Sequence, residues 1–149
     1  MSLKATIHKE MGAALKAGDK QKRTTLQLLT AAIKQKEIDE QIQLDDNQTL
    51  SIIEKMVKQR KESISQFKQA ERQDLIAKEE AEMTILQSYL PEPLSPTEIE
   101  DLIKEAIANT SATSLKDMGK VMGYIKPKAQ GRADLGALSA KIKERLQSL

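Results

Sequence analysis

Residues 89–96 read YLPEPLSP, and the three prolines of this stretch divide the chain. Proline lacks a backbone N–H and clashes with the preceding helical turn, so no helix continues through this stretch. A new helix is predicted directly after it, because Ser95 suits an N-cap, a proline follows at the first helical position and Glu98 completes a capping box. We therefore predict one domain over residues 1–92 and a second over residues 93–149.

Apolar residues recur at helical spacing before the prolines. A first helix is predicted over residues 3–17, with Gly18 as its C-terminal cap, and a second helix from Asp19. A helical pattern of about forty residues then follows from Thr49, which exceeds the usual helix length. A break near Ala70–Arg72 is predicted for this reason; one continuous helix is the alternative, because no Gly or Pro marks the place. The apolar seam of the second helix is predicted to be Leu26, Leu29, Ile33, Ile38 and Ile42.

Three short helices are predicted after the prolines. The first runs from Ser95 to Asn109, the second covers residues 115–125 and is ended by Pro127, and the third starts near Asp134. No alternating strand pattern is present. The predicted fold class is therefore all-α, with an N-terminal helical-hairpin domain of about four helices followed by a small three-helix bundle.

The composition excludes several kinds of protein. Of the 149 residues, 39% are apolar, which is enough for a modest core, but only 2% are aromatic, so aliphatic side chains must fill that core. No cysteine is present, which excludes disulfides and thiol chemistry. No apolar run approaches the roughly 20 residues that span a bilayer. A cytoplasmic location without membrane contact is expected.

The residues needed for catalysis are scarce. His8 is the only histidine and is interpreted as a surface residue, so histidine-based metal sites and Ser/His/Asp relays lack their parts. Neither a phosphate-binding Gly-Lys-Ser/Thr loop nor a Gly-rich dinucleotide motif is present. We predict no catalytic residue, no cofactor and no metal site.

Four charged residues before the prolines are interpreted as structural. Arg60 falls on or beside the apolar seam of its helix, where a partly buried charge needs a partner. Asp74 and Glu79 are the candidate partners on the following helical segment. Arg72 lies close to Asp74 in sequence and is a candidate for a local ion pair.

Positive charge is concentrated near the C-terminus. Residues 114–145 carry eight basic and three acidic side chains, whereas residues 1–92 carry fifteen of each. Within this segment, Lys126, Lys128 and Arg132 belong to a loop that leads into a helix N-terminus, which is a favourable place for a phosphate. Two alternatives stay open: an uneven solvated surface, or a helix end that Asp134 already caps.

Several segments resemble the YqeY family, in the order in which they occur there. This resemblance covers nearly the whole chain from the second predicted helix onward, although Glu71 and Leu135 stand where family members commonly have glycine. The segments are KQRKESISQF (58–67), AERQDLIAKEEAE (70–82), YLPEPLS (89–95), KDMGKVM (116–122) and GRADLG (131–136).

The resemblance implies a function without chemistry. The family is similar to the C-terminal tail of GatB, a subunit of the tRNA-dependent amidotransferase, and that tail is associated with tRNA binding. The matching motifs and the charge pattern together make seven residues candidates for RNA contact, although Gly119, like Gly123, has helix packing as its competing role. The candidates are Lys116, Gly119, Lys120, Lys126, Lys128, Gly131 and Arg132.

Three functional hypotheses follow from the resemblance. The first is a tRNA-binding accessory module that contacts the phosphate backbone by shape and charge, since few aromatic side chains are available for base stacking. The second is a protein-interaction module that docks on an aminoacyl-tRNA synthetase or an amidotransferase through its N-terminal helices. The third, ranked last, is a carbon–nitrogen ligase activity with glutamine as amido donor, for which the residues of both half-reactions are missing.

Overall fold

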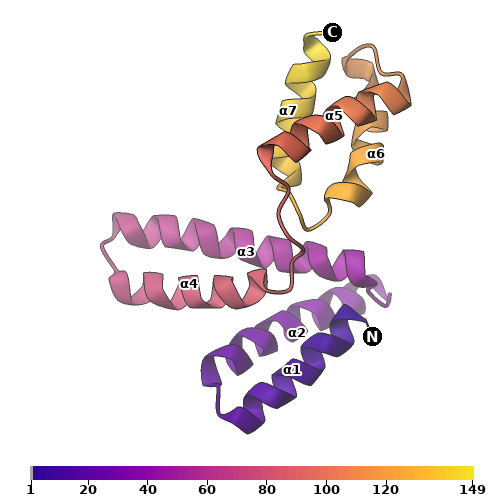
Figure 1. Ribbon diagram of the computed structural model, residues 1–149. Helices are drawn as coiled ribbons and strands as arrows, with labels where there is room; N and C mark the ends of the chain where they lie inside the picture. Colours follow the sequence, from indigo (N-terminus) through magenta and orange to yellow (C-terminus); the bar gives the residue numbers. More distant parts are fainter. Residues whose placement is uncertain (1) are drawn as a thin grey trace. The chain divides into compact units, whose positions relative to one another are not determined.

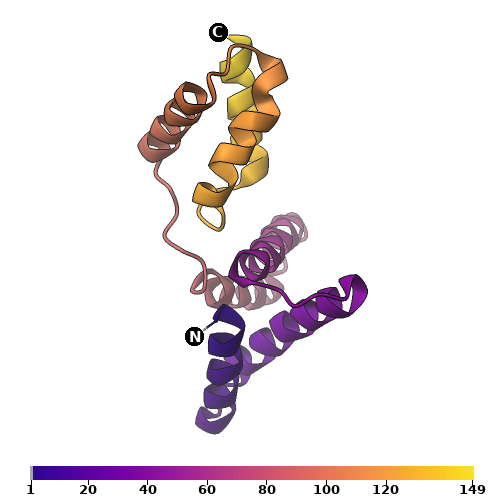
Figure 2. The same cartoon turned by 90° about the vertical axis from the view of Figure 1, so that its right-hand side faces the viewer.

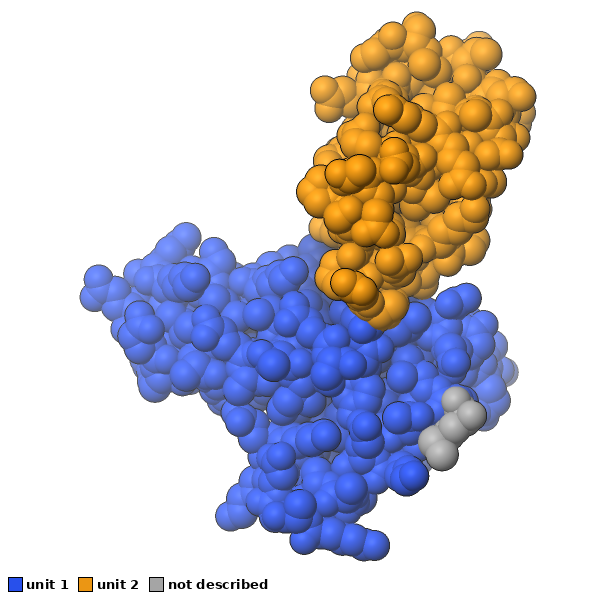
Figure 3. Space-filling view, in the orientation of Figure 1, with its two compact units in different colours: residues 1–90 blue, residues 91–149 orange. Residues whose placement is uncertain are grey.

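The computed structural model describes residues 2–149, which form helices and no strand. This confirms the all-α class. Two compact units are formed, Met1–Leu90 and Pro91–Leu149 (Figure 3). Each unit has its own buried core. The elements are α1 (Leu3–Ala17), α2 (Lys20–Glu40), α3 (Asp46–Gln69), α4 (Gln73–Gln87), α5 (Pro96–Thr110), the short 3₁₀ turn η1 (Leu115–Asp117), α6 (Met118–Ala129) and α7 (Leu135–Gln147) (Figure 1).

The turn between α1 and α2 forms as its residues predict. Gly18 has a left-handed backbone with φ of 73°, and the Asp19 side chain accepts a hydrogen bond from the Lys22 N–H at 3.1 Å. Glu37 near the end of α2 accepts hydrogen bonds from Lys4 Nζ at 2.5 Å and from the Leu44 N–H at 2.9 Å. These bonds, led by the one from Lys4, lower the pKa of Glu37 and tie the start of α1 to the end of α2.

The predicted break after the third helix is confirmed, and α3 and α4 run side by side as an antiparallel hairpin (Figures 1 and 2). Glu71 makes the turn in a left-handed conformation with φ of 55°. The following Arg72 N–H donates to the Phe67 carbonyl at 3.0 Å, which satisfies one of the last carbonyls of α3. A glycine is therefore not required for this turn, although the left-handed backbone strains a residue that has a Cβ.

Arg60 joins the two helices of this hairpin. Its guanidinium lies 3.3 Å from a carboxylate oxygen of Glu82, whose side chain is 7% exposed, and 3.9 Å from Glu79. In an antiparallel hairpin that turns at residue 71, residue 60 lies opposite residue 82. The prediction that Asp74 is a partner of Arg60 is therefore wrong, because Asp74 lies beside the turn and pairs with Arg72 at 3.2 Å.

The core of the first unit is aliphatic, as the composition requires. Leu26, Leu29 and Ile33 of α2 are buried there against α1, α3 and the end of α4. Ile38 and Ile42, predicted to continue the same seam, are instead 61% and 37% exposed. The reason is helical geometry. Ile38 lies twelve residues after Leu26, and at about 100° per residue this is three full turns plus about 120°, so Ile38 points away from the seam.

The second unit begins with the predicted capping box. The Glu98 N–H donates to the Ser95 hydroxyl at 3.1 Å, and the Glu98 carboxylate accepts from the Ser95 N–H at 3.1 Å. The predicted end of the middle helix at Pro127 is wrong, because α6 continues to Ala129. Ala129 is fully buried in the core of the second unit, and this burial favours the extra half turn despite the missing N–H of the proline.

The strain at Glu71 can be tested by substitution. Glu71→Gly is expected to raise the free energy of unfolding by about 0.5–1 kcal/mol, because glycine adopts the left-handed backbone without a Cβ clash. Thermal unfolding followed by circular dichroism measures the change. Glu80→Gly, in the exposed interior of α4, is the control and should lower stability by about 1 kcal/mol. A loss of stability in both variants would contradict the strain.

Candidate nucleic-acid interface

The sequence of α6 separates a buried face from an exposed face. Val121, Ile125 and Ala129 are fully buried, and their spacing of four residues directs them toward α5 and α7. The residues about half a turn away point outward and are exposed: Gly119, Lys120, Gly123, Lys126 and Pro127. Lys116, in the preceding turn η1, is also exposed. We call Lys116, Gly119, Lys120, Gly123 and Lys126 the α6 outer face.

The lysines of the α6 outer face keep their charge largely free. Lys120 lies 4.0 Å from Asp117, at the limit of an ion pair, and its side chain is 71% exposed. Lys116 and Lys126 have no ion-pair partner among the described residues. Lys116 and Lys126 can therefore take up a phosphate without first breaking an ion pair, and Lys120 would give up only its long contact with Asp117.

Lys128 is differently placed. Its Nζ lies 4.3 Å from the centroid of the Tyr124 ring and donates to the Tyr124 hydroxyl at 3.0 Å. The hydroxyl donates in turn to Glu105 of α5 at 2.8 Å, and Lys128 lies 3.5 Å from the same carboxylate. The hydrogen bond with Tyr124 raises the pKa of Lys128, and the bond from Tyr124 lowers the pKa of Glu105. This cluster cross-links α5 to α6.

Arg132 is likewise engaged inside the second unit. Its Nε donates to the Glu92 carbonyl at 2.9 Å and its Nη2 lies 3.7 Å from Glu98, while its own carbonyl accepts from the Leu94 N–H at 2.8 Å. These contacts fasten the segment before α5 to the loop after α6. The guanidinium therefore serves first as a structural link.

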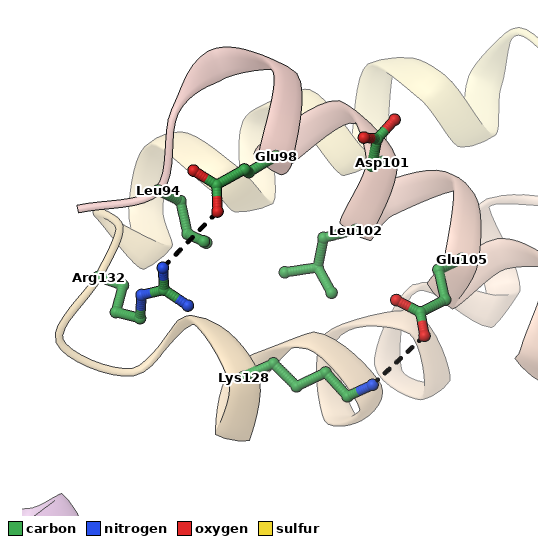
Figure 4. A pocket seen from close by; sticks show the side chains of 7 residues that line it. All are labelled: Leu94, Glu98, Asp101, Leu102, Glu105, Lys128 and Arg132. Atoms are coloured by element: carbon green, nitrogen blue, oxygen red, sulfur yellow. Dashed lines mark hydrogen bonds and ion pairs between the residues drawn. The ribbon is translucent and has the colours of Figure 1, made fainter. Parts of the chain in front are cut away.

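Lys128 and Arg132 border a shallow pocket of about 500 Å³ between α5 and the end of α6. Figure 4 shows both cations reaching toward carboxylates of α5, across the apolar side chains of Leu94 and Leu102. Asp101 also lines the pocket and makes no ion pair there among the described residues. Three carboxylates and two cations line the pocket, so it does not add to a phosphate-binding surface.

The glycine candidates also separate. Gly131 is buried and has φ of 77°, so it makes the turn after α6 and does not face solvent as a contact residue. Gly119 and Gly123 are exposed, and a Cβ built on either would meet nothing within 4 Å. The alternative prediction, that these two glycines allow close helix packing, is therefore wrong. They add no side chains of their own to the α6 outer face.

The N-terminus of α7 is already capped. The Asp134 carboxylate accepts a hydrogen bond from the Gly136 N–H at 2.9 Å. The sequence allowed either a phosphate at this helix N-terminus or a helix end that Asp134 caps, and the structure shows the cap. A carboxylate at this position disfavours a second anion there.

Ion pairs with α5 were missed by the sequence reasoning, which considered only residues 114–145. Arg145 of α7 lies 2.7 Å from Glu100, so α5 provides carboxylates to Lys128, Arg132 and Arg145 alike. The sequence did indicate partners for these cations, because residues 95–110 carry four acidic side chains and one lysine. Residues 91–149 as a whole carry nine basic and eight acidic side chains, so positive potential depends on where the free lysines lie.

Other chemistry is sparse in the part of the chain that the structure describes. No group of three or more His, Cys, Asp or Glu side chains among residues 2–149 is arranged to hold a metal ion. His8 is exposed on α1. Every described helix is too short or too polar to cross a bilayer.

Comparison with known proteins identifies similar sequences. The family model described as YqeY, Yqey-like protein, matches residues 4–146. "Altered inheritance of mitochondria protein 41, mitochondrial" from Lachancea thermotolerans is 31% identical over 93% of this chain and 78% of its own length. Proteins of the same name from Pyrenophora tritici-repentis and Vanderwaltozyma polyspora are 35% and 36% identical over 66% of this chain. The matched region spans little more than half of these two, 56% and 55%.

These relatives overturn one expectation. The cytoplasmic location predicted from the sequence is contradicted by this comparison, because the similar proteins are named as mitochondrial. The prediction rested on the absence of an apolar run long enough to span a bilayer, a criterion that does not distinguish between intracellular compartments.

The exposed glycines of α6 allow a stability test. Gly119→Ala and Gly123→Ala are each expected to raise the free energy of unfolding by up to about 1 kcal/mol, because alanine favours the helix and its Cβ meets no neighbour. Gly136→Ala is the control: its Cβ would lie 3.3 Å from the capping oxygen of Asp134, so no comparable gain is expected. Equal gains at all three positions would contradict the distinction. Chemical denaturation measures each value.

The Tyr124 cluster predicts a dependence of stability on pH. The folded-state pKa of Glu105 is lowered, so its contribution is complete above the usual glutamate pKa of about 4.3 and is lost as the pH falls through the lower folded value. Glu105→Gln should therefore lower the melting temperature at pH 7 and make it less sensitive to acidification. Glu144→Gln is the control. Melting curves from neutral to acid pH decide, and identical curves for wild type and Glu105→Gln would contradict the prediction.

Proposed function

This chain belongs to the YqeY family, and on that premise we propose that it is a non-catalytic helical module that binds the phosphate backbone of tRNA through the α6 outer face. The observation that carries the proposal is a set of exposed lysines that are unpaired or weakly paired: Lys116 in η1 and Lys120 and Lys126 in α6. Backbone phosphates attract such a surface regardless of base sequence. The choice of tRNA comes from the resemblance to the GatB tail.

The shape of the α6 outer face supports backbone contact rather than base reading. Gly119 and Gly123 carry no side chains, so a sugar–phosphate strand can approach the helix between the lysines. The only aromatic side chain of the second unit, Tyr124, is held by Glu105 and Lys128 and offers no free stacking platform. Recognition through charge and shape is typical of proteins that bind structured RNA without sequence preference.

The proposal narrows the seven candidates suggested by the sequence. Lys128 and Arg132 would have to leave Glu105 and Glu98 before contacting a phosphate, so we expect a smaller contribution from them. Gly131 is expected to act through the fold only. Lys116, Lys120 and Lys126 carry the interaction, with Gly119 and Gly123 allowing close approach.

The proposal is tested by binding of the full chain to tRNA over a series of salt concentrations. Replacing Lys116, Lys120 and Lys126 together by Ala should weaken binding about 10- to 100-fold at low salt and reduce the slope of log affinity against log salt by about two to three. The matched control replaces three exposed lysines of α3, Lys55, Lys58 and Lys61, and has the same change in charge.

The outcome distinguishes binding through the α6 outer face from a general effect of positive charge. Loss of binding in the α6 variant but not in the α3 variant supports the proposal. Equal loss in both indicates a nonspecific charge effect, and no binding by the wild type at low salt rejects RNA binding by this chain. A double variant of Lys128 and Arg132 to Ala is expected to lose less affinity than the α6 variant.

A further inference from the structure

The turn between α1 and α2 forms the tip of a helical hairpin, and a dense group of cations surrounds it (Figure 1). The eight residues 16–23 carry four basic side chains and one acidic side chain, that of Asp19, which gives this segment a net charge of +3. Residues 1–92 as a whole carry fifteen charges of each sign, so this is a local concentration. We call the four cations the hairpin tip: Lys16, Lys20, Lys22 and Arg23.

The fold makes little use of the charges of the hairpin tip. None of the four cations has an ion-pair partner among residues 2–149. Three of them lie in the first turn of α2, which carries no acidic residue, and the positive end of a helix dipole disfavours further positive charge. The capping carboxylate of Asp19 offsets only part of this charge. An anion bound beside the hairpin tip would offset the rest.

The charges at the other end of α2 are used differently. Residues 37–46 carry five acidic side chains and no basic one. Glu37 and Glu40 form ion pairs with lysines of the same unit. Asp45 and Asp46 accept hydrogen bonds from backbone N–H groups. Contacts within the unit thus account for most of the acidic end but not for the hairpin tip, so the hairpin tip fits an anion from outside the chain.

We propose that the hairpin tip is a second contact for the phosphate backbone of the RNA that the α6 outer face binds. This inference rests on the proposed function for the identity of the ligand. A run of phosphates suits several closely spaced cations, because each cation can neutralise one phosphate and release a counterion. The hairpin tip is thereby a binding surface in the first unit, separate in sequence from the lysines of the second unit.

RNA suits the hairpin tip better than an anionic membrane does. Helices that lie on membranes combine basic residues with a whole apolar face that enters the lipid. At residues 13–24, Leu15 is the one large apolar side chain that is exposed, at 56%. One leucine gives little apolar area for insertion, whereas four cations are sufficient for several phosphate contacts.

The inference is tested by measuring the affinity of the full chain for tRNA over a series of salt concentrations. The tip variant combines Lys16→Ala, Lys20→Ala and Arg23→Ala, and the partly buried Lys22 is left unchanged. It is expected to bind about 10- to 100-fold more weakly at low salt, and the slope of log affinity against log salt should fall by about two to three. The α3 variant is the control, because it removes three exposed cations from the same unit.

Combining the tip variant with the α6 variant tests whether the two surfaces act separately. The reductions in slope should add, because each set of cations releases its own counterions. Circular dichroism verifies that each variant is folded. A parallel arm measures binding to phosphatidylcholine vesicles with and without phosphatidylserine, which present anionic headgroups without RNA.

The outcomes distinguish this inference from the proposed function. Weaker tRNA binding by the tip variant but not by the α3 variant supports the hairpin tip, whatever the α6 variant does. Unchanged binding by the tip variant together with weaker binding by the α6 variant overturns this inference and leaves the proposed function intact. Equal loss in the tip and α3 variants, or no binding by the wild type, also overturns it. Unchanged tRNA affinity with loss of binding to anionic vesicles assigns the hairpin tip to a membrane surface instead.

Discussion

The prolines of residues 91–96 are the constraint on which the rest of the structure depends. They prevent the helix of α4 from continuing, so the chain on either side must bury its apolar residues separately. Each unit does so with aliphatic side chains and fastens its helices with polar contacts at the edge of the core. In the first unit these are Glu37 with Lys4 and Arg60 with Glu82; in the second they are the carboxylates of α5 with the cations of α6 and α7. Polar cross-links of this kind fix how helices meet where an aliphatic core alone leaves several packings open.

Local signals predicted the helices and most of their ends, because caps and proline effects involve residues close in sequence. Gly18 and the Ser95 capping box behave as expected. Errors arose where distant residues decide. Pro127 stays inside α6 because Ala129 is buried against other helices. Ile38 points outward because only the earlier part of α2, from Leu26 to Ile33, faces the core. Neither effect is visible in a window of a few residues.

The candidate site was predicted in composition but not in arrangement. Counting charges between residues 114 and 145 located the lysines, yet it treated all of them as available. Folding brings α5 beside α6 and α7, and its carboxylates neutralise Lys128, Arg132 and Arg145 while leaving the lysines of the α6 outer face exposed. Whether a cation is free depends on residues 23 to 45 positions away in sequence, and no local motif records that.

The two tyrosines have a practical consequence. The chain has no tryptophan, and the two units contain one tyrosine each: Tyr89 donates a hydrogen bond to Glu10 in the first, and Tyr124 donates to Glu105 in the second. A carboxylate that accepts a hydrogen bond from a phenol quenches its emission, and unfolding releases that quenching. Each unit therefore contains its own optical probe. With one tyrosine changed to phenylalanine, the emission of the other follows the opening of a single unit without any added label.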